Sequence, residues 1–509
     1  MNAASTLTSR LLTTGLLTER PRPRGIAGWR HAHWLAVGTV CLGAFLGQLT
    51  ASVTALVYPA LQRHFGTGFA AVEWVALAYL LVLVALLAPV GRLSDLVGRK
   101  TMYIGGFAVF GLASLGAGFA DGLGTLVALR AVQAVGGAMM QANSVALVAR
   151  GVPEHAMRRA LGIQAAAQGL GLALGPSLGG LLVEHASWRW VFWINVPVAL
   201  VGILAGWFLL PRTHRPDARP LNRPLNRPLN RPANEPTTRP VPRPRGAARP
   251  DPDGGRFDLA GLLLLAASTT ALLLALSAAS GLPLPGWAVA ALLLATVLCA
   301  LGLVRQERRA TRPILAPGLV NTPGVRPGLA VSLIGYLLLF CPLVLGPVLL
   351  AEAGLPTGQV GLVITLLPAS FAVAATAGGA LLPRGWSDVA RCRFGAALAG
   401  AGLLGCVLLP VAGAPAPAPA LPLLVAGWGL GVLLPANNAL VMRAIPAECS
   451  AVGGGMVNMA RSLGTALGTA LPVLGVHLAG PVLGGRAVLL ALAAVAVLAV
   501  ALTRPVRRR

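Results

Sequence analysis

The ten residues GRLSDLVGRK (91–100) hold three cations, one carboxylate and two glycines between two long apolar runs. The run before them is WVALAYLLVLVALLAPV (74–90), and the run after them is TMYIGGFAVFGLASLGAGFA (101–120). At about 1.5 Å per helical residue, each run is long enough to cross most of a hydrocarbon layer about 30 Å thick. The pattern predicts two membrane helices joined by a charged turn in water.

The rest of the chain has the same composition. Of 509 residues, 56% are hydrophobic and 11% are charged, whereas soluble proteins carry about 25% charged residues. We place fourteen helices at 34–57, 73–90, 102–120, 123–148, 160–183, 191–211, 257–280, 286–304, 328–351, 358–382, 394–413, 419–442, 452–478 and 486–503. Runs of this length, without short alternating segments, predict an all-α integral membrane protein and not a barrel.

The positive charge is distributed unevenly. If the N-terminus is cytoplasmic, 35 of the 40 Lys and Arg residues fall in inner segments and three (Arg63, Arg189, Arg486) fall in outer loops. This bias follows the positive-inside rule, so we expect a multi-pass protein of the plasma membrane with both termini cytoplasmic. A basic groove with base-reading partners is not found, so we expect no nucleic-acid partner. The six cysteines lack ligand spacing, so we expect no metal site.

Residues 212–256 break the pattern with RPLNRPLNRPLNRP and RPVPRPRGAARPDPDGG. A segment so rich in proline and arginine favours an extended chain over a packed domain. We interpret it as a disordered cytoplasmic tether. The alternative is a contact with anionic membrane lipid.

Several motifs together resemble a known family. GRLSDLVGRK is similar to the cytoplasmic helix 2–3 signature of the major facilitator superfamily, and RAVQAVGGAMM (130–140) resembles its R-x-x-Q-G-x-G pattern, with Ala134 in place of the first glycine. GLGLALGPSLGGLL (169–182) resembles the antiporter signature of helix 5. WRWVFWINVP (188–197) and NMARSLGTALGTA (458–470) resemble the fourteen-helix drug:proton antiporters, the multidrug efflux family.

This resemblance implies the major facilitator fold with 14 transmembrane helices, as two six-helix bundles plus two inserted helices. The expected parts are a basic N-tail (1–33), the N-terminal bundle (34–211), the linker (212–256), the inserted helices 7–8 (257–304), the C-terminal bundle (305–503) and a basic C-tail (504–509). Helices 1–6 would match helices 9–14. PRGWSDVARCR (383–393) repeats the loop motif through Ser387, Asp388 and Arg391, and Gly464, Gly468 and Pro472 echo helix 5.

The motif residues have expected roles. In the helix 2–3 loop, Gly91 and Gly98 allow the chain to turn, and Asp95 faces Arg99, next to Lys100, if the turn is helical.

In helix 5, Gly171, Gly175 and Gly179 recur every four residues and make a smooth face for close helix packing. Gly180 extends this stretch, and Pro176 can bend the helix. Two bundles that rock against each other need such a seam. Ordinary glycine packing is the alternative.

Acidic residues are missing from the predicted helix interiors. Members of the resembled family hold an acid in helix 1, in a pattern like L-D-x-T, and Thr50 stands at that position here. Glu73, Asp121, Glu184 and Glu352 fall at predicted outer helix edges. Since a membrane-embedded carboxylate is a natural proton carrier, its absence leaves proton coupling open.

Two arginines lie inside predicted helices and are functional candidates because a buried cation is costly. Arg130 precedes Gln133 on helix 4, and Asn458 precedes Arg461 on helix 13. The alternative for Arg130 is that its side chain extends to the membrane surface. His477 is interpreted as interfacial, and the alternative is a role in proton transfer. Candidate cavity residues are Gln48, Thr50, Ser52, Met139, Met140, Asn143, Gln164, Gln168, Asn437 and Asn438.

These observations predict a secondary transporter, not an enzyme. Potential catalytic groups are scattered, and a P-loop for ATP is not found. We expect a monomer that uses the proton gradient, without a cofactor, to export small amphiphilic drugs or secondary metabolites. The alternatives are an uptake symporter, an uncoupled facilitator or a transport-dead sensor. With Arg130 unbalanced by an acid at Thr50, neutral or anionic substrates are expected to be preferred over lipophilic cations.

Overall fold

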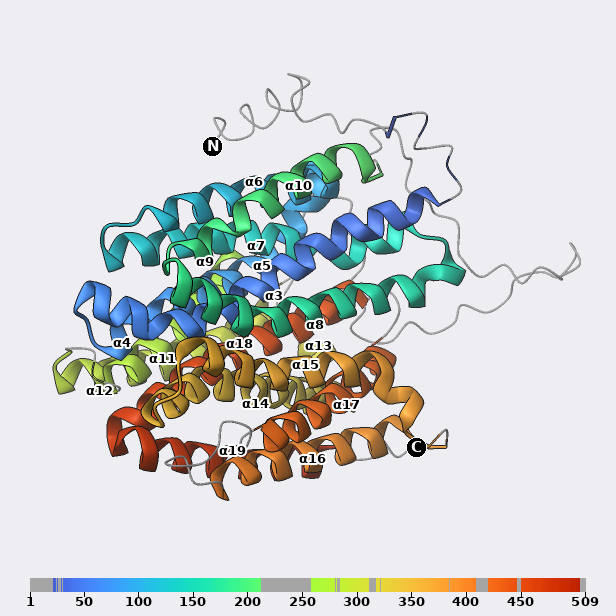
Figure 1. The fold of residues 1–509 in the computed structure, drawn as a ribbon. Helices are drawn as coiled ribbons and strands as arrows, with labels where there is room; N and C mark the ends of the chain where they lie inside the picture. The colour runs from blue at the N-terminus through green and yellow to red at the C-terminus, as the bar shows by residue number, and fades with distance from the viewer. Residues whose placement is uncertain are drawn as a thin grey trace, which may run out of the picture.

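The computed structural model describes residues 22–23, 25, 29, 31–211, 258–279, 281, 284–310, 317–320, 322–383, 385–408, 420–445 and 450–503. Within these ranges the regular structure is helical, without strands (Figure 1). The long helices are α3 (Ala32–Phe65), α5 (Trp74–Val97), α6 (Arg99–Gly118), α7 (Leu123–Gly151), α8 (Glu154–His185), α10 (Asn195–Leu209), α11 (Leu259–Ala279), α12 (Gly286–Arg309), α14 (Val325–Glu352), α15 (Thr357–Leu381), α16 (Asp388–Leu408), α17 (Ala420–Ala444), α18 (Ser450–Ala479) and α19 (Gly485–Leu502). Short helices are α4 (Phe69–Val72), α9 (Trp190–Trp193) and α13 (Pro317–Val320). The predicted linker lies outside the described residues.

Thirteen segments of the described chain are long and apolar enough to cross a membrane. The last of them, Gly453–Leu502, is 50 residues long and contains both α18 and α19, joined by the π-helical turn η2 (Gly480–Gly484). Helices α4 and α5 share one span, and α9 and α10 share another. The described helices therefore fit the expected multi-pass architecture.

The helices form two bundles with the same internal pairing, seen as the blue-green and the orange-red halves of Figure 1. In the first bundle α3 packs along α8, α7 packs against both α5 and α6, and α6 contacts α10. In the second bundle α14 packs along α18, α17 packs against both α15 and α16, and α16 contacts α19. The bundles meet through α8 with α15 and through α5 with α18, which are equivalent pairs in this arrangement.

Helices extend beyond the predicted apolar runs. The stretch 91–97, expected to be part of a turn, continues α5, and Gly98 alone separates α5 from α6. Gly98 has a φ of 105°, in the range that favours glycine, whereas Gly91 lies inside the helix. Hydropathy marks the part of a helix inside the hydrocarbon, but backbone hydrogen bonding continues into the polar region.

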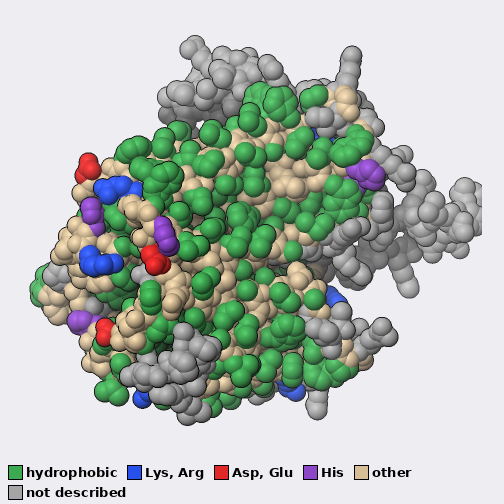
Figure 2. Space-filling model, in the orientation of Figure 1, with side chains coloured by type: hydrophobic (Ala, Val, Ile, Leu, Met, Phe, Trp, Pro, Cys, Tyr) green, Lys and Arg blue, Asp and Glu red, His purple; other side chains and the backbone are tan. Residues whose placement is uncertain are grey.

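The two additional helices lie at the edge of the bundles. α11 packs against α12, α18 and α5. In the apolar stretch of α12 only 6% of the residues are buried inside the protein. Figure 2 shows one face of the molecule, on which hydrophobic side chains cover most of the surface and many of the charged ones gather near one end. This distribution suits a protein surrounded by lipid, with water at its ends.

Candidate functional site

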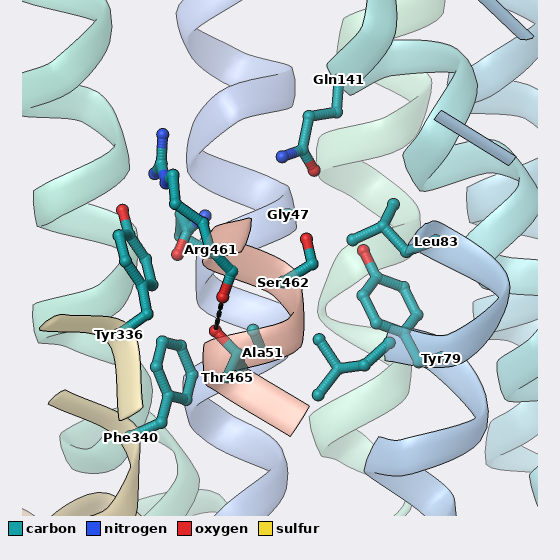
Figure 3. Close-up of a pocket in the computed structure, with 12 residues that line it drawn as sticks. Gly47, Ala51, Tyr79, Leu83, Gln141, Tyr336, Phe340, Arg461, Ser462 and Thr465 are labelled. Carbon is teal, nitrogen blue, oxygen red and sulfur yellow. Dashed lines mark hydrogen bonds between the residues drawn. The ribbon is translucent and has the colours of Figure 1, made fainter. Parts of the chain in front are cut away.

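A pocket lies between the two bundles, surrounded by α3, α5 and α7 from one bundle and by α14 and α18 from the other (Figure 3). Its lining residues are Gly47, Gln48, Ala51, Tyr79, Leu80, Leu83, Gln141, Tyr336, Phe340, Arg461, Ser462 and Thr465. The open space is about 40 Å³, room for a few water molecules and far less than the roughly 300 Å³ of small drug-binding pockets. Admission of a drug-sized molecule therefore requires the bundles to move apart.

A second, smaller pocket adjoins the first. Tyr58, Ala76, Arg130, Leu343, Val344 and Thr469 are added to the lining, and Ala51, Tyr79, Leu80, Phe340 and Thr465 are shared with the first pocket. The shared residues make the two pockets one column between the bundles. Aromatic rings, neutral polar groups and two arginines line this column, and its described lining residues include no Asp or Glu.

Arg461 links the two bundles within the column. Its guanidinium lies 4.5 Å from the ring centre of Tyr336 on α14, a cation–π arrangement. Its Nη1 donates to Asn458 Oδ1 at 3.4 Å, and its Nη2 donates to Gln168 Oε1 on α8 at 3.5 Å. These long bonds to neutral acceptors leave the positive charge without a carboxylate partner among these contacts. Asn458 and Gln168, both predicted as site residues, lie beside it.

Arg130 is fully enclosed, with 1% of its surface exposed, so the alternative in which it extends to the membrane surface is wrong. Its Nε donates to the backbone O of Val75 at 2.7 Å, its Nη1 to Gln133 Oε1 at 2.6 Å and its Nη2 to Thr54 Oγ1 at 3.3 Å. The guanidinium also lies 4.6 Å from the ring centre of Tyr79. Neutral groups thus hold Arg130 in place.

This network continues through Gln133 to a third helix. Gln133 Nε2 donates to Ser114 Oγ on α6 at 2.6 Å. Gln133 and Ser114 are both fully buried. The predicted helix 4 pair is therefore a polar junction that ties α7 to α3, α5 and α6.

Other predicted cavity residues join helices within one bundle. Thr50 Oγ1 donates to Asn195 Oδ1 on α10 at 3.1 Å. Asn143 donates to Ser94 Oγ on α5 at 2.7 Å, and Asn437 donates to Ser332 Oγ on α14 at 2.8 Å. Met139 packs toward α6, where its Cε would lie 3.1 Å from a Cβ at Gly105. Gln48 lies in the lining of the column, whereas these four are outside the lining of both pockets.

Sequence reasoning missed the aromatic lining. The chain has four tyrosines, and Tyr58, Tyr79 and Tyr336 line the column. Tyrosine in membrane proteins is enriched at the interfaces, so Tyr79 and Tyr336, well inside apolar runs, are a signal of a polar site, whereas Tyr58 stands at the end of its run. Gln141, Ser462 and Thr465 in the lining gave no comparable signal.

The glycine face of α8 packs on α3. A Cβ at Gly171 would overlap the backbone O of Phe45, one at Gly175 would overlap Ser52 Oγ, and one at Gly179 would lie 2.8 Å from Val53 Cγ2. The glycines therefore allow two backbones to approach more closely than any side chain permits.

The neighbouring face of α8 meets the other bundle. The backbone O of Pro176 would lie 2.6 Å, and Gly180 Cα 3.3 Å, from a Cβ at Gly361 on α15. Ser177 Oγ and Thr365 Oγ1 are hydrogen-bonded at 2.5 Å across the same seam. The predicted outer halves of α8 and α15 are thus in close contact.

The repeated loop motif caps helices in both bundles. Lys100 is buried, and its Nζ donates to the backbone O atoms of Trp207 and Leu210, at 2.9 and 3.0 Å, at the end of α10. In the second bundle Arg393 Nε donates to Thr503 O at 2.9 Å, at the end of α19. A cation at a helix C-terminus satisfies carbonyls that lack helical partners.

Of the acids in the two loop motifs, Asp388 has a described side chain and Asp95 does not. Asp388 pairs with Arg443 on α17, with Nη1 and Oδ2 2.7 Å apart. The side chain of Asp95 lies outside the described part of the structure. The helical spacing expected between Asp95 and Arg99 is interrupted at Gly98, because α5 ends and α6 begins there.

Glu73 lies at a helix edge, as predicted, but it is enclosed there. It stands between α4 and α5 and has 0% of its surface exposed. Its Oε1 accepts a short hydrogen bond from Ser277 Oγ on α11. The sequence placed Glu73 at the start of an apolar run, which gives its depth but not what covers it laterally.

Comparison with known proteins agrees with this architecture. A sequence profile of the Major Facilitator Superfamily matches residues 40–469. The human organic anion transporter MFSD10 (TETRAN) has a similar fold in its crystal structure, with a TM-score of 0.59 and 16% identity over 93% of this chain and 99% of that one.

Three curated relatives cover most of the chain. The puromycin resistance protein pur8 of Streptomyces alboniger is 33% identical over 86% of this chain and 80% of its own length. The tetracenomycin C resistance and export protein of Streptomyces glaucescens is 28% identical over 90% of this chain and 79% of its own. The riboflavin transporter RibZ of Clostridioides difficile is 27% identical over 86% and 87%.

Proposed function

The chain belongs to the major facilitator superfamily, and we propose on that premise that it is a fourteen-helix drug:proton antiporter. It is a multi-pass membrane transporter of small molecules. The proposed direction is export of drug-like or secondary-metabolite molecules across the plasma membrane, by a monomer with cytoplasmic termini, driven by the proton gradient. Two relatives named for antibiotic resistance, one of them also for export, support this direction.

The arginines of the column support a preference for neutral or anionic amphiphiles. Arg130 and Arg461 contribute positive charge from opposite bundles, and the described lining holds no carboxylate to balance it. In a site with little water, a lipophilic cation is repelled by these charges, whereas an anion is attracted. The aromatic rings and amide groups suit amphiphiles of varied shape.

Efflux of three fluorescent probes from cells lacking their own pumps tests both the direction and the charge preference. Fluorescein is anionic, riboflavin is neutral and rhodamine 123 is cationic. We expect fluorescein and riboflavin to be exported faster than rhodamine 123. An uncoupler is expected to abolish the export of fluorescein and riboflavin. Strong export of the cation alone would contradict the charge preference, and accumulation of a probe would contradict export.

Substitution of Arg461 tests the observation that carries the proposal. Arg461→Gln keeps hydrogen-bonding groups near Asn458 and Gln168 but removes the charge. We expect the anion-to-cation efflux ratio to fall about tenfold, equivalent to about 1.4 kcal/mol. Arg308→Gln, at an exposed position near the end of α12, is the matched control and leaves the ratio unchanged.

A second candidate function is uptake of a neutral, flavin-like molecule, favoured by the similarity to the riboflavin transporter. The same neutral lining residues suit such a substrate. The two candidates predict opposite signs for riboflavin movement in the probe assay.

A further inference from the structure

Glu73 is a carboxyl group enclosed on all sides with few polar contacts. Both Glu73 and Ser277 have 0% of their surface exposed. Glu73 Oε1 accepts the hydrogen bond from Ser277 Oγ, and Glu73 Oε2 is buried without a hydrogen-bond partner. A buried carboxylate is stable only when it is paired or fully hydrogen-bonded, so this environment favours the protonated acid.

The group is close to the column between the bundles. Ala76, one helical turn after Glu73, lines the second pocket, and Val75 accepts the hydrogen bond from Arg130. Tyr58 from α3 lines the same pocket, together with Ala76 and Arg130. The enclosed acid is therefore one helical turn from the lining of the column.

The surrounding elements contribute few other titratable groups. Tyr58 lines the adjoining pocket from α3, and Arg130 reaches the same turn of α5 from α7. α11 contributes Ser277, and beyond its end the ring of His477, from α18, lies against Gly281. In the described structure, no lysine or second carboxylate is recorded in contact with Glu73.

α11 also lies where relative movement of the bundles is expected. It contacts α4 and α5 of the first bundle and α18 of the second, and Figure 1 shows α11 beside α4 at one end of the molecule. If α11 moves with α18 when α5 separates from it, the contact between Glu73 and Ser277 opens and water reaches the carboxyl group. A hydrated carboxyl releases its proton more readily than an enclosed one.

We propose that Glu73 binds and releases the proton that drives transport, and that Ser277 of α11 is a positioning residue for its carboxyl group. In the enclosed state the group is CO₂H. When α5 separates from α18, the O–H bond breaks, the electron pair stays on the carboxylate, and the proton passes to water. α11, one of the two additional helices, is thereby part of the proton site. This inference rests on the proton-driven transport proposed above.

Infrared spectroscopy of the full-length purified protein tests proton binding without any substrate. The C=O stretch of a protonated buried carboxyl is followed as pH is varied. We expect a titrating band in the wild type that is lost in Glu73→Gln and kept in Asp121→Asn, whose side chain is exposed. A band that persists in Glu73→Gln, or a wild type without a titrating band, overturns the assignment.

Transport by protein reconstituted in liposomes tests coupling separately. An imposed pH gradient is expected to drive uphill movement of fluorescein or riboflavin by the wild type and by Asp121→Asn. Glu73→Gln is expected to lose uphill movement while still exchanging probe across the membrane. Uphill movement by Glu73→Gln overturns the inference. If the wild type moves no probe, the proposed function fails, and the infrared titration still decides whether Glu73 binds a proton.

The role of Ser277 is tested by the pH profile. Ser277 donates to the carboxyl, so its hydroxyl stabilises the charged form more than the neutral one. Ser277→Ala is therefore expected to shift the infrared and transport midpoints to higher pH without abolishing transport. Ser268→Ala is the matched control on α11, since Ser268 is also buried but bonds to its own helix at Leu265 O. Equal profiles for the two variants contradict the positioning role.

Discussion

At the scale of single residues, Arg130 shows how a cation is accommodated in a membrane protein without an acid. Its donors reach three neutral acceptors on three different helices, at Val75, Gln133 and Thr54. The planar guanidinium fork fits these diverging directions, whereas a lysine ammonium is a compact group on a flexible stem. The charge and the geometry are therefore separable experimentally.

Arg130→Lys keeps the charge but is expected to lower probe efflux at least about tenfold and to reduce thermal stability. Each buried acceptor left unpaired costs about 1–3 kcal/mol. Efflux and the melting temperature of the purified protein are measured together. Arg63→Lys is the control, because Arg63 is exposed and its Nε donates to Pro59 O of its own helix. Normal efflux by Arg130→Lys would show that charge alone suffices.

At the scale of helices, the α3–α8 pair shows what the glycine spacing achieves. Gly171 and Gly175 leave the backbone of α8 against Phe45 and Ser52 of α3. Without a hydrophobic effect between helices in lipid, such close packing is a main source of association.

Gly171→Ala is expected to destabilise the first bundle by about 1–3 kcal/mol, since the added methyl meets backbone atoms that cannot rotate away. The melting temperature in detergent reports this change. Gly124→Ala on α7 is the matched control, because nothing lies within 4 Å of a Cβ at that position. Equal melting temperatures for both variants would mean that α8 shifts to accept the methyl group.

At the scale of the whole molecule, the close contact of α8 and α15 and the narrow column together describe a state closed at the predicted outer side. Ser177 and Thr365 join the two bundles directly. Transport by rocking bundles requires this seam to open and close.

Oxidation of the double variant Ser177→Cys/Thr365→Cys is therefore expected to stop probe efflux, and reduction is expected to restore it. The two side-chain oxygens are hydrogen-bonded, 2.5 Å apart, so the two side chains point toward each other, as a disulfide at these positions requires. Each single variant is the control for effects of the native cysteines. If the cross-linked protein exports the probe as fast as the protein with reduced cysteines, the contact between α8 and α15 does not open during transport.

Sequence alone determined which parts of the chain are membrane helices and where smooth glycine faces occur. Lipid requires every backbone group to bond within its helix, so each apolar run near 20 residues can be assigned locally. It also identified Arg130 and Arg461 as cations inside apolar runs; the structure encloses Arg130 and leaves Arg461 half-buried in the lining of the column. The ends of helices were harder to predict from the sequence, as the continuation of α5 to Val97 shows.

Only the tertiary structure decided what lies beside each residue. The enclosure of Glu73 depends on Ser277, 204 residues away on α11, and the partner of Thr50 is Asn195, 145 residues away on α10. Hydropathy measures depth along the membrane normal and carries no information about lateral neighbours. Whether a side chain faces a pocket, a neighbouring helix or lipid is fixed by helix packing, so an acid placed at an edge by sequence became an enclosed acid in the folded protein.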